Sequence, residues 1–188
     1  MKGSGLLLSL AAAATASASP LVKIAFGGKS GSPFHFTSTF SVQIEPKNVV
    51  DNNNQPTGGL AGTYGLFQYG INSHENVICY NLTLDGFTGQ YSSPARTATH
   101  IHEGPAGRAG PPRIAFPNPE GPEGARRTSL GCLRGPFTTG IMANNRDTGE
   151  GFHVRQIEQN PSGFFTDVHS SLALPGAARG QLNARKGC

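Results

Sequence analysis

Apolar and polar residues alternate along several short stretches of the chain. In residues 78–84 every second residue is apolar, namely Ile78, Tyr80, Leu82 and Leu84. A period of two is typical of a β-strand that buries one face, so the residues between them are expected to face away from the core. This outward set comprises Cys79, Asn81 and Thr83.

A looser alternation predicts an earlier strand at residues 34–44, with an inner face of Phe34, Phe36, Phe40, Val42 and Ile44. Residues 62–69 and 77–84 predict a β-hairpin that is joined by a polar connection at residues 70–76. Further strands are predicted at residues 96–102, 113–116, 164–171 and 178–182, and short apolar pieces at 131–135 and 137–141. One short helix or turn is expected within residues 151–163.

Loops rich in Gly and Pro separate these stretches, at residues 51–59, 104–112 and 117–124. Turn signals at such spacings are typical of a β-sandwich. No internal repeat and no second domain boundary interrupts the pattern. We therefore predict one loop-rich, all-β domain at residues 34–182, an antiparallel β-sandwich with Greek-key-like connections.

The composition supports this fold class by excluding others. The chain of 188 residues contains 26 Gly and 14 Pro, and only 14% of its residues are charged, where about 25% is usual. Gly and Pro break helices, and few charged pairs remain to support them, which argues against a helical bundle or a coiled coil. The apolar share of 36% is too high for a wholly disordered chain.

The N-terminus has the pattern of a secretory signal peptide at residues 1–18. Lys2 supplies the positive start, residues 6–14 are apolar, and Ala16-Ser17-Ala18 is a small-residue cleavage site. A Gly/Ser-rich spacer at residues 19–33 and a polar tail at 183–188 flank the domain. No later stretch has the roughly 20 apolar residues that a membrane span needs. We expect a secreted, extracellular protein with no membrane span.

Secretion changes how the three cysteines are interpreted, because two of them should pair in an oxidising compartment. Cys79 and Cys132 are the favoured pair, since both lie inside patterned segments, whereas Cys188 is the last residue and is left free or pairs with another chain. Asn81-Leu82-Thr83 is the one N-glycosylation sequon, which makes Asn81 the predicted glycan site.

Histidine supplies the candidate chemistry. His100 and His102 are two residues apart in a predicted strand, so both point to one face, and Asp167 and His169 repeat that spacing in another. If the two strands pair, the three imidazoles would converge on one metal, zinc or copper, with Asp167 as a ligand or as a partner that orients one. The alternative is that these are polar strand residues that hydrogen-bond to nearby loops.

Other functions find less support in the sequence. It lacks the G-x-S-x-G, H-E-x-x-H and C-x-x-C motifs, and no local signature groups Ser, His and Asp for catalysis. A net charge of +4, with Arg126-Arg127 as a two-residue cluster, does not indicate a nucleic-acid partner. Arg179 has two open interpretations: an ion pair with Asp167 or Glu103 that fixes the closing strand, or the binding of an anionic ligand.

Two separated motifs resemble the CHRD domain, a domain named from chordin. Residues 98–107 (ATHIHEGPAG), followed by Gly110-Pro111, are similar to its central signature. Residues 164–170 (FFTDVHS), followed by Arg179-Gly180-Gln181-Leu182, are similar to its closing signature, with Asp167 where Asn is usual. The segments at residues 78–81 and 135–140 resemble those of single-domain fungal relatives.

The resemblance implies an extracellular β-sandwich module, distantly similar to Cu/Zn superoxide dismutases, whose sandwich also carries a His-x-His strand. Our first hypothesis is a non-enzymatic secreted module that binds an extracellular protein or a cell-wall component. The second is a metal-binding protein, redox-active if the metal is copper, that uses His100, His102, His169 and Asp167. A fold-level similarity alone does not transfer an activity.

Overall fold

The computed structural model describes residues 35–183, which lie in the larger of two compact units of the chain, Phe34–Cys188. The predicted signal peptide at residues 1–18 and the spacer at 19–33 lie outside the described residues. So do Phe34, Cys188 and all but the first residue of the predicted tail.

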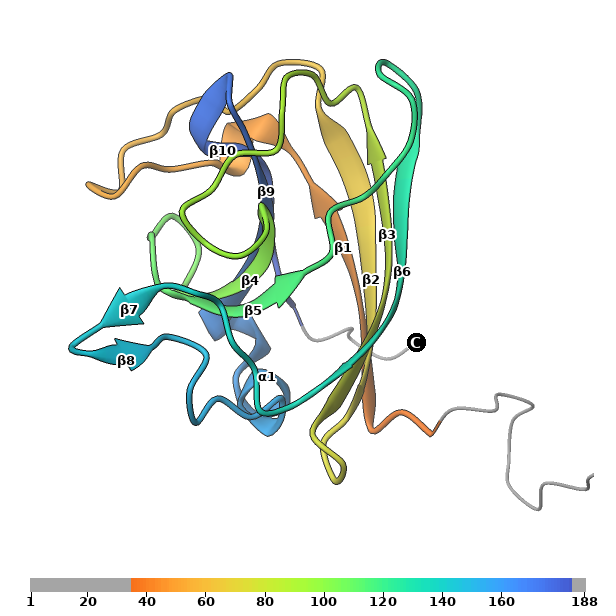
Figure 1. The fold of residues 1–188 in the computed structure, drawn as a ribbon, viewed down its shortest axis with the longest axis vertical. Helices are drawn as coiled ribbons and strands as arrows, with labels where there is room; N and C mark the ends of the chain where they lie inside the picture. The colour runs from red at the N-terminus through yellow and green to blue at the C-terminus, as the bar shows by residue number, and fades with distance from the viewer. Residues whose placement is uncertain (1–34, 184–188) are drawn as a thin grey trace, which may run out of the picture. The chain divides into compact units, whose positions relative to one another are not determined.

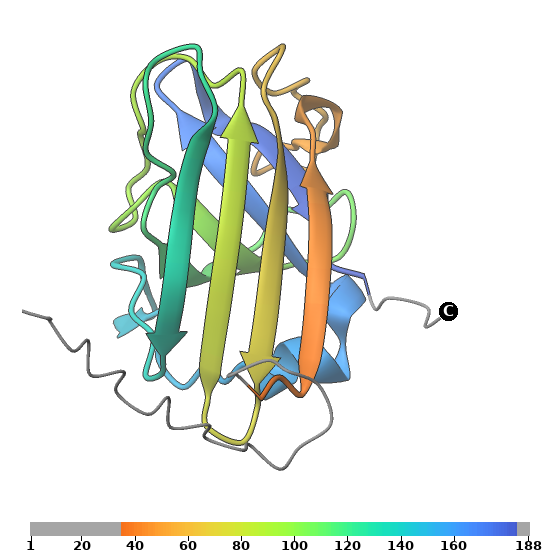
Figure 2. The same cartoon turned by 90° about the vertical axis from the view of Figure 1, so that its right-hand side faces the viewer.

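Two antiparallel four-stranded sheets pack face to face, as the edge-on view of Figure 1 shows. The first sheet has the order β1-β2-β3-β6, with the bounds β1 Ser38–Ile44, β2 Tyr64–Asn72, β3 Val77–Asp85 and β6 Arg127–Arg134. The second has the order β10-β9-β4-β5, with the bounds β10 Ala173–Gln181, β9 Phe164–Ser170, β4 Thr99–Glu103 and β5 Pro112–Phe116. In Figure 2 the second sheet crosses behind the first at an angle. The predicted all-β antiparallel sandwich is confirmed.

Small elements complete the domain at its edges. They are the 3-10 turns η1 (Pro46–Asn48) and η2 (Pro161–Gly163), the hairpin β7 (Met142–Ala143) and β8 (Arg146–Asp147), and the one-turn helix α1 (Arg155–Gln159). The short helix or turn expected within residues 151–163 is therefore present, as α1 followed by η2. No helix among residues 35–183 is both long and apolar enough to cross a membrane.

The core lies between the inner faces of the two sheets. Ile78, Tyr80, Leu82 and Leu84 of β3 are buried as their alternation predicts. Phe116 of the second sheet packs against Tyr69 and Tyr80 of the first, with ring centroids 5.4 and 5.1 Å apart. Burial of such side chains contributes about 1.5–3 kcal/mol each, which makes this layer the main source of stability.

Phe36 departs from the predicted inner face of the first strand. The strand begins only at Ser38, so the alternation does not extend back to Phe36. Its ring instead covers Gly70 on β2, where an added Cβ would come within 2.7 Å of the ring. Gly70 leaves the space that lets this aromatic ring cross to the outer face of the first sheet. Phe40, Val42 and Ile44 are buried as predicted.

Several strand bounds also differ from the predictions. β2 and β3 extend into the expected connection, which leaves a loop at residues 73–76, and β4 begins at Thr99 rather than at residue 96. β6 was predicted only from residue 131, yet it starts at Arg127. It is an edge strand whose Leu130 is 79% exposed, so its apolar residues do not follow a buried face. β10 starts at Ala173, before a bulge that ends at Ala178.

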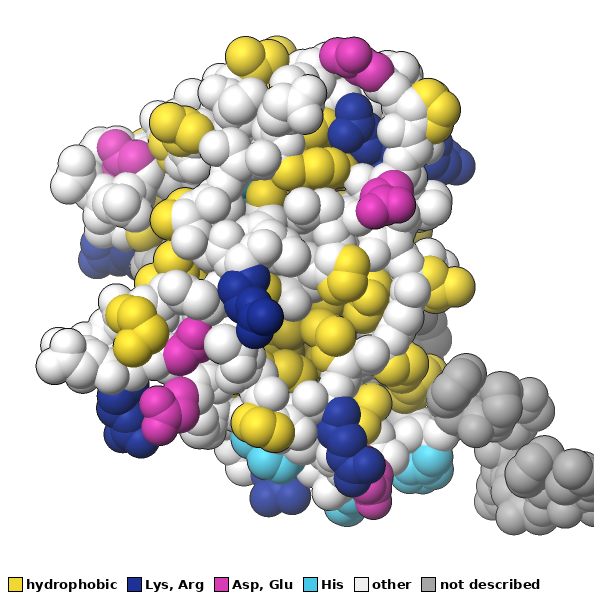
Figure 3. Space-filling view, viewed as in Figure 1, with side chains coloured by type: hydrophobic (Ala, Val, Ile, Leu, Met, Phe, Trp, Pro, Cys, Tyr) yellow, Lys and Arg dark blue, Asp and Glu magenta, His cyan; other side chains and the backbone are white. Residues whose placement is uncertain are grey.

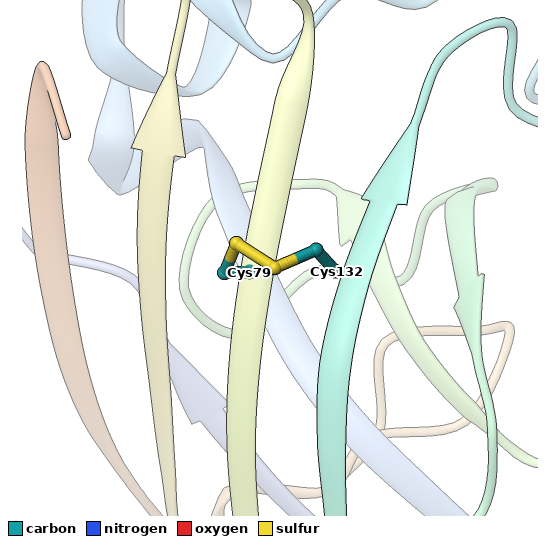
Figure 4. Close-up of a disulfide and its surroundings, with 2 residues drawn as sticks. All are labelled: Cys79 and Cys132. Carbon is teal, nitrogen blue, oxygen red and sulfur yellow. A yellow bond between two sulfur atoms is a disulfide. The ribbon is translucent and has the colours of Figure 1, made fainter. Parts of the chain in front are cut away.

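The predicted disulfide between Cys79 and Cys132 is confirmed. The two cysteines are directly opposite each other in the β3–β6 register, and their bond links these neighbouring strands (Figure 4). Cys79, Asn81 and Thr83 point away from the core, as the alternation of β3 indicates. The bond therefore ties the edge strand β6 to the centre of the first sheet.

Candidate metal centre

The four predicted ligands meet on one face of the second sheet. His100 and His102 lie on β4, Asp167 and His169 lie on β9, and the two strands are antiparallel neighbours with His100 opposite Asp167. The intervening residues Ile101 and Val168 point into the core. Because side chains alternate along each strand, the four polar groups share the opposite face. The strand pairing that was the condition for a common site is therefore present.

The ligand atoms lie close enough together to share one ion. One donor atom from each of the four residues can be chosen so that all four lie within 4.8 Å of one another. His102 Nε2 and His169 Nε2 are each 3.2 Å from a carboxylate oxygen of Asp167, and His100 Nδ1 is 3.5 Å from one. Tetrahedral zinc with bonds of about 2.0–2.1 Å separates its ligands by roughly 3.3 Å. These separations fit a first-row divalent ion.

Each imidazole is held by its other ring nitrogen. His100 Nε2 faces the carbonyl of Thr97 at 2.7 Å, His102 Nδ1 that of Gly110 at 2.8 Å, and His169 Nδ1 that of Leu174 at 2.9 Å. A carbonyl only accepts hydrogen bonds, so each of these nitrogens donates its N–H. In a neutral imidazole the inward nitrogen then carries a lone pair, which is the form that a metal binds.

Sequence reasoning did not identify these three carbonyls. Thr97 precedes the strand, Gly110 lies in the Gly/Pro-rich turn after it, and Leu174 lies in the bulge of β10. Every residue has a backbone carbonyl, so no residue type marks the three positions. Only the loop conformations decide which carbonyls meet the imidazoles.

Three buried polar atoms of the cluster have no hydrogen-bond partner: His100 Nδ1, His102 Nε2 and Asp167 Oδ1. A buried polar group without a partner costs about 1–3 kcal/mol, and more if it is charged. The three atoms lie together, because Asp167 Oδ1 is 3.5 Å from His100 Nδ1 and 3.2 Å from His102 Nε2. A cation between them would satisfy them together, so the residues present fit a metal ion.

The electrostatics of the cluster favour a cation at its centre. Burial alone would raise the pKa of Asp167, but His102 and His169 hold it well below its usual range. Burial lowers the pKa of His100, against the attraction of Asp167. For His169 burial would also lower the pKa, but Asp167 raises it to about 9. At neutral pH the carboxylate is therefore charged and attracts either a proton on His169 or a metal.

A cavity of about 600 Å³ adjoins the cluster. His100, His102 and His169 line it, together with the loops at residues 50–53 and 93–95 and Pro175 of β10. Asp167 is not among its lining residues. The three histidines therefore face this cavity, while Asp167 lines a smaller one of about 60 Å³ with His102, His169 and Arg179.

Phe165 and Arg179 flank the site. Phe165 of β9 stacks on the His102 ring, with centroids 4.8 Å apart and planes at 7°, and the Arg179 guanidinium lies 3.4 Å from the Phe165 centroid. Arg179 donates to the carbonyl of Pro105 at 3.1 Å. Within residues 35–183 Arg179 does not form the ion pair that was considered with Asp167 or Glu103. Asp167 faces the imidazoles, and Glu103 pairs with Arg113 at 2.6 Å.

Comparison with known proteins supports one family. The CHRD domain family matches residues 40–182, a range that contains both sheets apart from the first two residues of β1. No curated protein and no solved structure matches the chain, so the distant similarity to Cu/Zn superoxide dismutases stays a prediction. The match includes all four residues of the histidine–aspartate cluster and the strands that carry them. The chain belongs to the CHRD domain family.

Proposed function

We propose that this CHRD-domain protein is a secreted, non-enzymatic module that binds one zinc or copper ion through His100, His102, Asp167 and His169. The observation that carries the proposal is the orientation of the three imidazoles. Each donates its outer N–H to a carbonyl and points its other nitrogen at Asp167. Loops and turns hold the donors in this arrangement, which is typical of a built metal site.

The number of donors favours a structural role over catalysis. Structural zinc sites are closed by four protein ligands, whereas catalytic sites keep one position for water or substrate. Three imidazoles and one carboxylate would complete a tetrahedral shell. The metal would then link β4 to β9 and support a module whose task is to bind an extracellular protein or a cell-wall component.

A redox-active copper protein is the second candidate, and the adjoining cavity is the observation that favours it. Three histidines line that cavity and Asp167 does not. Copper accepts more than four ligands, so a small molecule in the cavity would be able to reach it. Azide separates the candidates: a closed shell leaves the absorption spectrum of the copper-loaded protein unchanged, whereas an accessible copper gives a new azide-to-copper band.

Three features support secretion. The disulfide between Cys79 and Cys132 is typical of oxidising compartments. Asn81 of the sequon is exposed on β3, where a glycan would be accommodated. Residues 1–18 have the pattern of a signal peptide, although they lie outside the described residues.

One experiment tests secretion, glycosylation and metal binding together. The full chain is expressed in a secreting eukaryotic host, recovered from the medium, dialysed with zinc or copper and analysed by native mass spectrometry. We expect an N-terminus at residue 19, a glycan on Asn81 and one metal ion per chain. His100→Ala and His169→Ala should lose the ion, whereas His74→Ala, on an exposed hairpin loop, should keep it. Substoichiometric metal that both variants leave unchanged would refute the metal site.

The pH dependence of stability should differ with and without metal. In chelated protein, the folded pKa of His169 of about 9 exceeds its ordinary 6.5, so the His169–Asp167 attraction stabilises fully below pH 6.5 and is lost as the pH rises through 9. The free energy of unfolding should fall by up to about 3 kcal/mol over this range. Urea titrations at each pH measure it.

Metal-saturated protein should instead gain stability as the pH rises from acid, and it should lack the decline between pH 6.5 and 9. Its ligands bind no protons when folded, whereas the unfolded histidines take up protons below about pH 6.5. Stability should therefore rise from pH 5 to 7 and stay level to pH 9. Equal slopes for the two forms would contradict metal binding by His169.

A further inference from the structure

Among residues 35–183, Arg179 is a buried cation without an ionic partner. Arg179 is a residue of β10, and its side chain is buried, since the residue is only 3% exposed. The hydrogen bonds it makes within residues 35–183 use one nitrogen, Nη2, which donates to Pro105 O at 3.1 Å and to Gln181 Oε1 at 3.4 Å. By contrast, the more exposed Arg113, Arg126, Arg134 and Arg146 each pair with a carboxylate. Arg179 is less exposed than these four arginines and has no such counter-charge among residues 35–183.

The carboxylate of Asp167, on the neighbouring strand, does not neutralise the charge of Arg179. Asp167 is directly opposite Arg179 in the β9–β10 register, but its oxygens face three imidazoles. Burial lowers the pKa of Arg179, and Asp167 only partly opposes that effect. A buried charge with incomplete compensation is costly, and stacking on the ring of Phe165 supplies part of the missing stabilisation. Donors of the guanidinium remain for another acceptor.

A hollow of about 700 Å³ begins at this arginine. It lies where β1 meets β10, next to the bridge between Glu45 and Arg179. Its polar lining consists mainly of Gln43, Lys47, Asn48, Arg179, Gln181 and Asn183. None of its lining residues is acidic, and Lys47 forms an ion pair of 2.7 Å with Glu45, which lies outside the lining. The hollow is therefore net positive and within the size range of ligand sites, about 300–1,000 Å³.

On the face seen in Figure 3, Lys and Arg side chains are scattered, and several stand beside Asp or Glu. The hollow instead combines two cations with amide groups, the hydroxyl of Ser41 and the apolar surfaces of Pro56 and Leu66. A sugar ring carries both hydroxyls and apolar C–H faces, so this mixed lining suits a sugar better than a simple ion.

We infer that the hollow between β1 and β10 binds a carboxylate-bearing sugar chain, with Arg179 and Lys47 as its cationic anchors. A planar guanidinium matches a carboxylate with two parallel hydrogen bonds. The amides of Gln43, Asn48 and Asn183 are placed to hydrogen-bond sugar hydroxyls. None of the four residues of the histidine cluster lines the hollow, although Arg179 also lines a small cavity of about 60 Å³ with His102, Asp167 and His169. The proposed sugar contacts do not require a bound metal.

The test is a calorimetric titration with a galacturonic acid oligomer. The full chain is used both metal-loaded and chelated, and we expect binding in both states that weakens as salt is added. A neutral galactose oligomer of the same length should not bind, and free citrate should compete if the carboxylate is the recognised group. Equal binding of the neutral oligomer, or no binding of the acidic one at millimolar concentration, would overturn the proposal.

Variants locate the binding to this hollow. Arg179→Gln should weaken binding by at least about 30-fold, because it removes a buried charged donor. Lys47→Glu should weaken it about tenfold, and its exposed side chain makes loss of folding an improbable cause. The matched control is Arg134→Glu, which reverses an exposed charge on the far edge strand β6 and should bind like the wild type. Unchanged binding in Lys47→Glu would place the ligand elsewhere.

Discussion

Removal of the proposed metal ion with a chelator should lower the melting temperature of the protein by about 10 °C. A ligand at 1,000 times its dissociation constant stabilises the folded state by about 4 kcal/mol. For a domain of this size, each kcal/mol changes the melting temperature by roughly 2–4 °C. The ion would also satisfy the three buried atoms that have no other partner. Differential scanning calorimetry with and without EDTA measures the change.

Ligand variants separate metal binding from general damage to the fold. Asp167→Ala removes the one carboxylate of the cluster, so the melting temperature should be low from the start and should not respond to zinc or EDTA. His74→Ala keeps all four ligands and should respond like the wild type. A wild-type melting temperature that EDTA leaves unchanged, in protein shown to contain one metal ion, would contradict the proposed structural role.

Loss of the Cys79–Cys132 disulfide should lower the free energy of unfolding by about 4 kcal/mol. The two cysteines are 53 residues apart, and closing a loop of that length restricts the unfolded chain by about this amount in the chain-entropy model. The double substitution Cys79→Ala and Cys132→Ala removes the bond and leaves no free thiol on the sheet. Urea unfolding of both proteins measures the difference.

Cys188→Ser is the matched control, because it removes a cysteine that is not part of this bond. It should unfold like the wild type in a monomeric preparation. In the double-alanine variant, strand β6 should be the first part to lose protection in hydrogen exchange, since β3 is its only neighbour in the sheet. If the free energy of unfolding of the double-alanine variant were within 1 kcal/mol of that of the wild type, β6 would not depend on the disulfide.

The strand alternation predicted much of the fold. In β3 the period of two identified both faces correctly, and with them the outward direction of Cys79 and Asn81. The same spacing placed His100 beside His102 and Asp167 beside His169. These predictions succeeded because the direction of a side chain depends on its immediate neighbours along the strand.

The alternation of apolar and polar residues did not predict other parts of the fold. Phe36 left the predicted inner face because Gly70, a residue of another strand, provides room for its ring. β6 was predicted too short because an edge strand with Leu130 in solvent lacks a continuous apolar face. An ion pair was one of two open interpretations of Arg179, but both candidate carboxylates are engaged elsewhere. In each case the position of the residue in the tertiary structure decided the outcome.

The sequence by itself determined the all-β class, the faces of the strands and the residue types available for a metal. Only the tertiary structure decided that β4 and β9 are neighbours, that His100 lies opposite Asp167, and that three backbone carbonyls turn the imidazoles inward. The physical reason is the range of each interaction. Side-chain alternation is local, whereas strand register and loop closure depend on the packing of segments that are far apart along the chain.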